Sequence, residues 1–193
     1  MVLPDEDKYS TTRNQMLDQL AYTMGGRAAE ELVFHDPTTG ASNDIEKATT
    51  LARAMVTQYG MTEKLGAIKL GTSDSAPFLG RDYGHQRDYS EHLASVVDSE
   101  IRSLIENAHQ EAYEILVENR SILDALVEEL LEKETLQKEE IEVIFKRVAS
   151  RPKRPAWTGS ATRAPSRIPP VPLKPKVEPT PEPEPTKRRK KTT

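Results

Sequence analysis

The chain has 193 residues with a net charge of −4, and 36% hydrophobic against 30% charged residues is typical of a charge-rich helical protein. It has no cysteine, which excludes disulfides and thiolate zinc sites. No stretch approaches the about 20 apolar residues of a membrane-spanning helix, and Met1–Asp5 lacks the features of a signal peptide, so we expect a soluble chain.

The first predicted element is a helix over about residues 12–33. Thr12 and Gln15 have the spacing of a capping box. Apolar residues follow at helical spacing, namely Met16, Leu17, Leu20, Ala21, Met24, Ala28 and Leu32. Gly25 and Gly26 interrupt the helix at a cost of about 1 kcal/mol each relative to alanine. We expect the close approach of a neighbouring backbone to offset that cost.

A second helix is predicted to start at Ser42, after a turn over residues 35–40. Asn43 and Glu46 have capping-box spacing, and Gly60 is a favourable helix stop. Ala67–Leu70 is a candidate for a short strand. The polar stretch that follows, residues 71–87, is expected to be a loop.

The clearest predicted element is a long helix over about residues 89–117, with Asp88 and Glu91 as its capping pair. Two shorter helices are predicted over residues 121–133 and 137–149. Their buried faces are expected to be Ile122, Leu123, Leu126 and Leu130 in the first and Ile141, Ile144, Phe145 and Val148 in the second. The fold class is therefore mainly α, a helical bundle with a candidate short strand.

Charge and proline set the end of the chain apart. Residues 1–149 carry a net charge of −13, whereas residues 150–193 carry +9 and eleven of the fourteen prolines. Proline recurs there too often for helix or sheet, and stretches such as 169–172 and 179–185 are expected to be extended and solvated. We therefore expect a disordered, basic, proline-rich tail over 150–193 without packed structure.

Three carboxylates are the candidates for chemistry that the pattern itself offers. Glu30 and Glu31 lie late in the first predicted helix and Asp44 lies at the start of the second, so a helical hairpin would bring them together near its turn. Carboxylates gathered without Lys or Arg between them favour a cation. Two simpler explanations stay open, because the helix macrodipole favours an aspartate at a helix start and neighbouring glutamates usually face solvent.

The histidines and glycines add no catalytic motif. His35 and His85 lie in predicted turns or loops, and neither they nor His92 and His109 belong to an H-E-x-x-H helix. The sequence also lacks the G-x-x-x-x-G-K loop that cradles nucleotide phosphates and the G-x-S-x-G turn of serine hydrolases. No nucleotide site is expected in this chain.

Several segments resemble, in order, the protease domain of FtsH-type ATP-dependent zinc metalloproteases. They are Leu3–Asp7, Gly25–Glu31 and above all Thr39–Asp44, which continues through Ala48-Thr49, Ala52–Val56, Tyr59–Met61 and Glu63–Gly66. The long helix from Tyr89 and the region Leu123–Glu132 also look like the family. The resemblance covers about residues 3–148, so residues 1–149 are expected to be the C-terminal portion of such a zinc peptidase domain.

The resemblance implies a zinc site. In the family, two histidines of an H-E-x-x-H helix and one aspartate hold the zinc, and Asp44 matches that aspartate. Asp44 is thus implied to be the third protein ligand, with the fourth position open for the attacking water. Glu30 matches a family carboxylate close to the metal, which implies that it supports a ligand histidine. Close packing of helices around the metal would then explain Gly25-Gly26.

The resemblance also implies partners and a location. The family degrades unfolded or membrane proteins as a homo-hexamer at the cytoplasmic face of the bacterial plasma membrane, driven by ATP in an AAA module, and no nucleic acid is expected. The family's H-E-x-x-H lies upstream of the position matching Leu3. We therefore expect this chain to lack two zinc ligands, the general base, the membrane anchor and the AAA module. On its own, with no catalytic residue, it should bind zinc weakly and hydrolyse nothing.

Two alternatives assign this chain a role other than peptide hydrolysis. In one, the long helix mediates oligomerisation, or regulates a full-length relative by joining its ring. In the other, the tail binds an acidic partner or lipid headgroups through the basic run Lys187–Lys191, which predicts strong salt dependence. The simpler explanation of that run is a solubilising end.

Overall fold

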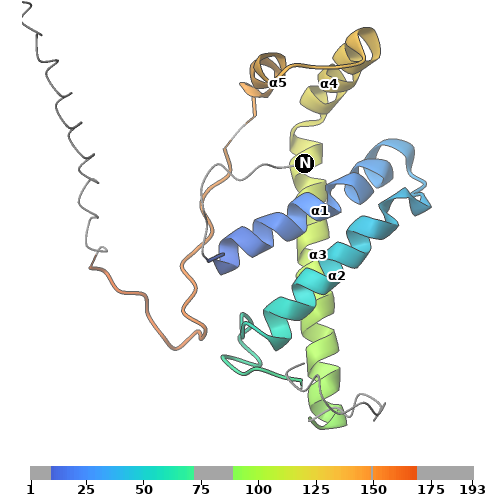
Figure 1. Cartoon of the computed structure of the whole chain (residues 1–193). Coiled ribbons are helices and arrows are strands. Elements are labelled where there is room, and N and C mark those ends of the chain that lie inside the picture. The colour runs from blue at the N-terminus through green and yellow to red at the C-terminus, as the bar shows by residue number, and fades with distance from the viewer. Residues whose placement is uncertain (1–9, 72–88, 149, 169–193) are drawn as a thin grey trace, which may run out of the picture.

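The fold is built on one long helix, α3, and a helical hairpin that crosses it. The computed structural model describes residues 10–71, 89–148 and 150–168. Within these ranges the elements are α1 Arg13–Phe34, the 3-10 turn η1 Thr39–Ala41, α2 Ser42–Thr57, α3 Glu91–Glu118, α4 Arg120–Lys133 and α5 Lys138–Phe145. Helices α1 and α2 lie side by side across α3, and α4 and α5 lie beyond one end of it (Figure 1). The mainly helical fold class is confirmed.

The hydrophobic core lies where α1, α2 and α3 meet. Its largest fully buried side chains are Leu20 of α1, Met55 and Val56 of α2 and Val97 of α3. Many other core positions are alanines, namely Ala28, Ala48, Ala52, Ala108 and Ala112. Small side chains at the crossing points allow the helix axes to approach closely. The apolar stripes predicted for the first three helices therefore supply this core.

The helix starts follow the sequence signals in part. The capping box at α1 is confirmed, because Thr12 Oγ1 accepts from Gln15 N–H at 3.3 Å and Gln15 Oε1 accepts from Thr12 N–H at 2.9 Å. The predicted Asn43–Glu46 box is wrong. Since η1 leads directly into Ser42, Asn43 already lies inside the first turn of α2, and no side chain caps this helix. At α3 the cap is Ser90, whose Oγ accepts from Leu93 N–H at 3.3 Å.

The segment after α2 is a tight turn rather than a strand. Gly60 has a φ of 59°, and a Cβ there would lie 2.6 Å from the carbonyl oxygen of Gly66. Only glycine fits such a position without displacing the opposite backbone. The candidate strand Ala67–Leu70 is not formed, because the Leu70 N–H donates to Thr57 O at 2.7 Å and folds the segment back against the end of α2.

Helices α4 and α5 cover less apolar surface than the sequence predicts. Of the side chains expected to be buried, only Ile122 is, while Leu130, Phe145 and Val148 are exposed. The two helices contact each other, and α4 also contacts α3, whereas the buried core cluster contains no residue of either helix. The last helix also ends at Phe145, four residues before the predicted end at residue 149. The expected faces are confirmed for Ile122, are half-buried at Leu123, Leu126, Ile141 and Ile144, and are wrong for Leu130, Phe145 and Val148.

Residues 150–168 form neither helix nor strand, as their prolines predict. They nevertheless contact the helices, since Arg151 and Arg154 pair with side chains of α1 and α3. The expectations for the loop over 72–87 and for the tail over 169–193 concern residues outside the described ranges. None of the described helices is both long enough and apolar enough to cross a membrane.

Candidate functional site

Asp44, the candidate zinc ligand, lies in the first turn of α2, just after the turn that joins α1 to α2. Its side chain is 44% exposed. Among the described residues its ion-pair partner is Lys47, with Oδ1 and Nζ 3.5 Å apart. The positive end of the α2 macrodipole stabilises a carboxylate at this position. Asp44 therefore presents a charged carboxylate whose long contact with Lys47 leaves it accessible to another cation.

Glu30, the second candidate, holds the turn that leads to Asp44. Its Oε2 accepts from Thr38 N–H and its Oε1 accepts from Thr38 Oγ1–H, each at 2.8 Å. The backbone hydrogen bond from Thr38, followed by the hydroxyl one, lowers the pKa of Glu30 below its ordinary value. Gly40 lies close by, since a Cβ there would be 3.6 Å from Glu30 Oε1. Glu30 thus fixes the backbone from which η1 and α2 begin.

Glu31 turns away from this pair toward α3. Its Oε1 lies 2.6 Å from Arg27 Nε, one turn earlier in α1, and its Oε2 lies 3.1 Å from His109 Nε2 on α3. The side chains of Arg27, Glu31 and His109 are each less than a third exposed. Glu31 therefore pairs with Arg27 within α1 and lies against the imidazole of His109 on α3, so these side chains connect the two helices.

The three carboxylates do not gather into one site. Glu30 contacts Thr38, Glu31 contacts Arg27 and His109, and Asp44 contacts Lys47, so the predicted convergence is wrong. Adjacent helical residues point in directions about 100° apart, which separates Glu30 from Glu31. In the ranges that the structure describes, no three His, Asp or Glu side chains form a group that could hold a metal ion.

Three of the four histidines lie in the described ranges, and His109 is the one of them that lies against a carboxylate in those ranges. His35 ends α1 in the left-handed conformation, with a φ of 57°. His92 lies in the first turn of α3 and is exposed. The contact of His109 with Glu31 is described above, and His85 falls outside the described ranges.

A groove of about 830 Å³ runs between α1 and α3, with Asp44 on its edge. Its lining combines small or apolar residues, among them Ala21, Gly25 and Gly26, with five charged ones, which are Asp18, Asp44, Lys47, Glu111 and Arg154. A Cβ at Gly25 would meet nothing within 4 Å, and one at Gly26 would meet only Asp44 Oδ2, at 4.0 Å. The predicted close approach of a neighbouring backbone is therefore wrong. The two glycines instead leave space in the groove beside Asp44.

The donor chemistry of this edge fits zinc in part. A carboxylate oxygen is one of the ligands that zinc accepts together with imidazole nitrogens. Asp44 offers such an oxygen beside an open groove, with room next to it at Gly26. Because the described residues form no group of three donors, the chemistry of this edge suits a single carboxylate ligand and no more.

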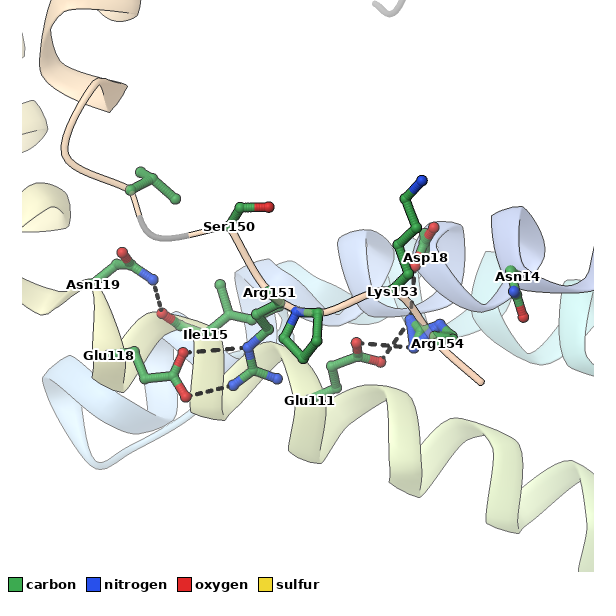
Figure 2. A pocket seen from close by; sticks show the side chains of 12 residues that line it. Asn14, Asp18, Glu111, Ile115, Glu118, Asn119, Ser150, Arg151, Lys153 and Arg154 are labelled. Atoms are coloured by element: carbon green, nitrogen blue, oxygen red, sulfur yellow. Dashed lines mark hydrogen bonds and ion pairs between the residues drawn. The ribbon is translucent and has the colours of Figure 1, made fainter. Parts of the chain in front are cut away.

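The sequence reasoning missed a second charged cluster, where residues 150–154 cross α1 and α3. Figure 2 shows Arg154 directed at Glu111 and Arg151 directed at Glu118, with Asp18 of α1 close to Arg154. Arg154 also lines the groove that has Asp44 on its edge. The hollow under residues 150–154 and the groove beside Asp44 therefore share four lining residues, Asp18, Glu111, Ile115 and Arg154.

A family model and several curated relatives indicate the same family for this chain. The model of peptidase family M41 matches residues 1–144. A Cutibacterium acnes protein named ATP-dependent zinc metalloprotease FtsH is 59% identical over 171 residues, which are 89% of this chain and 24% of that protein. Proteins of the same name from Mycobacterium leprae and Mycobacterium tuberculosis are 54% identical over 89% of this chain and 22% of their own length. The chain thus spans about a quarter of the length of these curated relatives.

Proposed function

Because this chain belongs to peptidase family M41, we propose that it is a portion of an ATP-dependent zinc endopeptidase in which Asp44 supplies one protein ligand to the catalytic zinc. The observation that carries the proposal is the position of Asp44. It combines a helix N-terminus, a long contact with Lys47 and an open groove beside Gly26. The names of the relatives support the zinc and ATP dependence of the complete protein.

In this proposal the residues of the chain orient the ligand. Glu30 binds Thr38 through two hydrogen bonds, and Thr38 in turn accepts from Gly40 N–H at 3.1 Å. These contacts hold η1 and therefore the start of α2, on which Asp44 stands. The alanines of α2, among them Ala48 and Ala52, anchor the helix in the core. Glu30 acts as a positioning residue through the backbone, and any contact with a ligand histidine is a further part of the proposal.

Zinc in such a site supplies Lewis-acid polarisation of a peptide carbonyl and activation of water. The 193 residues contain no H-E-x-x-H motif and no phosphate-binding loop. The proposal therefore assigns the histidine ligands, the general base and ATP hydrolysis to other parts of a protein about four times as long, like its relatives. A hexameric, membrane-anchored assembly acting on unfolded or membrane proteins is the expectation that accompanies this family.

The test is a substitution in the protein expressed from the complete gene. We expect Asp44→Ala to abolish casein hydrolysis and to release zinc, measured by atomic emission after gel filtration, while ATP hydrolysis continues. Asp44→Asn should behave similarly, since a neutral amide is a poor zinc ligand. The matched control is Glu46→Ala, an exposed carboxylate in the same turn of α2, which should keep both zinc and hydrolysis.

Retention of zinc and of full casein hydrolysis by Asp44→Ala would refute the ligand role. The non-enzymatic helical module is the less favoured candidate, since the matched relatives are named as metalloproteases. That candidate would gain support if the complete protein, with Asp44 intact, hydrolysed neither casein nor an unfolded protein in the presence of zinc and ATP.

A further inference from the structure

The segment 150–158, called the strap below, is tied to two helices by one arginine. Arg154 forms a fork on Glu111 of α3, with Nη1–Oε1 at 3.0 Å and Nη2–Oε2 at 2.9 Å. Its Nη2 also donates to Asp18 Oδ1 of α1 at 2.7 Å. A bidentate guanidinium–carboxylate pair is the most directional of the common ion pairs. Arg154 therefore bridges α1 and α3 across 136 and 43 residues of sequence.

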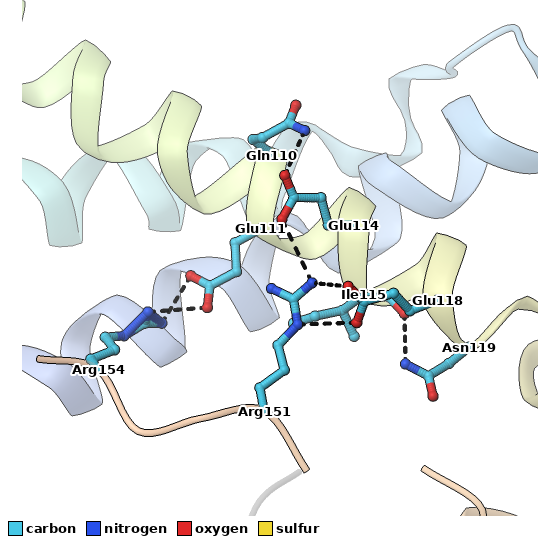
Figure 3. A network of polar contacts seen from close by, with 8 residues as sticks. All are labelled: Gln110, Glu111, Glu114, Ile115, Glu118, Asn119, Arg151 and Arg154. Carbon is cyan, nitrogen blue, oxygen red and sulfur yellow. Dashed lines mark hydrogen bonds and ion pairs between the residues drawn. The ribbon is translucent and has the colours of Figure 1, made fainter. Parts of the chain in front are cut away.

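A second arginine repeats the arrangement on α3. Arg151 donates from Nε to Glu118 Oε2 at 3.2 Å and from Nη2 to Glu118 Oε1 at 2.7 Å, and Glu114 Oε2 lies 3.6 Å from the same Nη2 (Figure 3). The strap therefore places two guanidinium groups along one acidic face of α3.

The spacing of these charges matches between strap and helix. Glu111 and Glu118 are seven residues apart, or about 10.5 Å along a helix. Arg151 and Arg154 are three residues apart, or about 10 Å along an extended chain. Each arginine also precedes a proline, Pro152 or Pro155, which disfavours helical backbone at the arginine. The sequence Arg-Pro-Lys-Arg-Pro is thus pre-organised to run antiparallel to two turns of α3.

An aromatic contact fixes the far end of the strap. The guanidinium of Arg13, the first residue of α1, lies 4.6 Å from the centre of the Trp157 ring, a cation–π geometry. Thr158 Oγ1 then donates to Arg163 O at 2.6 Å and closes a turn. The strap is therefore attached at three points. Arg151 binds α3, Arg154 binds both α1 and α3, and Trp157 contacts the start of α1.

We infer that the strap is an electrostatic latch that holds α1 against α3 and closes one side of the groove beside Asp44. Arg154 lines both that groove and the hollow beneath the strap, together with its partners Asp18 and Glu111 and with Ile115, so its release would widen the connection between the two. The carboxylates of Asp18 and Glu118 are more than half exposed. Ion pairs of this kind are individually weak and are screened as salt shortens the Debye length from about 10 Å at 0.1 M to about 3 Å at 1 M. The latch is therefore reversible. The inference rests on these contacts alone and does not require Asp44 to bind zinc.

Two probes in the full 193-residue chain test the latch. Trp157 is its single tryptophan, so intrinsic fluorescence reports docking of the strap. The chain also lacks cysteine, so Ala21→Cys introduces one thiol at a buried position of the groove. We expect sodium chloride raised from about 0.05 to about 1 M to shift Trp157 emission to the red and to speed thiol labelling several-fold.

Variants distinguish the specific ion pairs of Arg154 from the total positive charge of the strap. At low salt, Arg154→Ala should already show the red-shifted Trp157 emission and the fast thiol labelling that the parent shows at high salt. Lys153→Ala, which removes one positive charge between the two arginines, should behave as the parent. Arg154→Glu should open the latch, and adding Glu111→Arg should restore slow labelling at low salt. Far-UV circular dichroism checks that the helices persist.

If neither the labelling rate nor the Trp157 emission of the Ala21→Cys chain responds to salt, the latch is overturned. This test requires no substitution in the strap. Equal rates for Arg154→Ala and Lys153→Ala at low salt would also overturn it. Loss of the zinc role of Asp44 in the complete protein would leave these outcomes unaffected, so the two proposals fail separately.

Discussion

Glu30 and Thr38 lie eight residues apart in sequence, and the carboxylate of Glu30 accepts hydrogen bonds from both the backbone N–H and the hydroxyl of Thr38, each at 2.8 Å. This pair closes the turn between α1 and α2 and precedes the helix start that carries Asp44. A carboxylate that accepts two hydrogen bonds is stabilised in its charged form. The turn should therefore depend on the ionisation of Glu30.

The first prediction concerns pH. The pKa of Glu30 in the folded chain is lowered by its hydrogen bonds to Thr38. Its stabilising contribution is then fully present above the unfolded pKa, about 4.3, and is lost as pH falls through the folded pKa. Urea unfolding should find Glu30→Gln less stable than the parent at pH 7. The gap should shrink as both are acidified below pH about 4, and a gap that stays constant would contradict this role.

The second prediction separates two glycines that both have positive φ. A Cβ at Gly60 would lie 2.6 Å from Gly66 O and 2.7 Å from Ala67 Cα, whereas a Cβ at Gly66 would meet nothing within 4 Å. Gly66→Ala should cost about 1 kcal/mol for the left-handed backbone alone. Gly60→Ala should cost about 3 kcal/mol or more, because the opposite backbone must also move. Chemical denaturation measures both, and equal costs would show that the turn relaxes freely.

The third prediction tests the core against the surface with one residue type. Leu20 is completely buried between helices, so Leu20→Ala should lower the free energy of unfolding by about 2–5 kcal/mol. Leu131 on α4 is 81% exposed, and Leu131→Ala should change the free energy of unfolding by at most about 0.5 kcal/mol. Thermal unfolding followed by circular dichroism compares them. Similar losses in the two variants would mean that α4 has a covering partner in solution.

The fourth prediction concerns the arm formed by α4 and α5. Lys133 Nζ lies 2.8 Å from Glu129 Oε2 within α4 and 2.9 Å from Glu140 Oε1 on α5, and the hydrogen bonds to these carboxylates raise its pKa. Lys133→Ala should speed amide hydrogen exchange over residues 138–145 several-fold. Lys138→Ala is the control, since its 3.9 Å contact with Glu142 stays within α5. Unchanged exchange after Lys133→Ala would show that apolar contacts alone hold the arm.

Local patterns were enough to predict the helices. The three-and-four spacing of apolar residues predicted α1, α2 and α3, and Thr12 with Gln15 predicted the start of α1. The motif around Asp44 indicated the family, which the match over residues 1–144 confirms. These features depend on residues within a few turns of one another, and the order of side chains along the chain fixes those relations directly.

Only the tertiary structure decided which surfaces are covered and which charges meet. The apolar stripes of α4 and α5 resemble those of the core helices, yet Phe145 stays exposed because, among the described elements, α5 packs mainly on α4. Gly25 gives space to a groove rather than to a neighbouring backbone. Arg154 reaches Asp18 across 136 residues. An ion pair depends on the distance between two side chains in space. For residues far apart in sequence, that distance is set only when the helices pack.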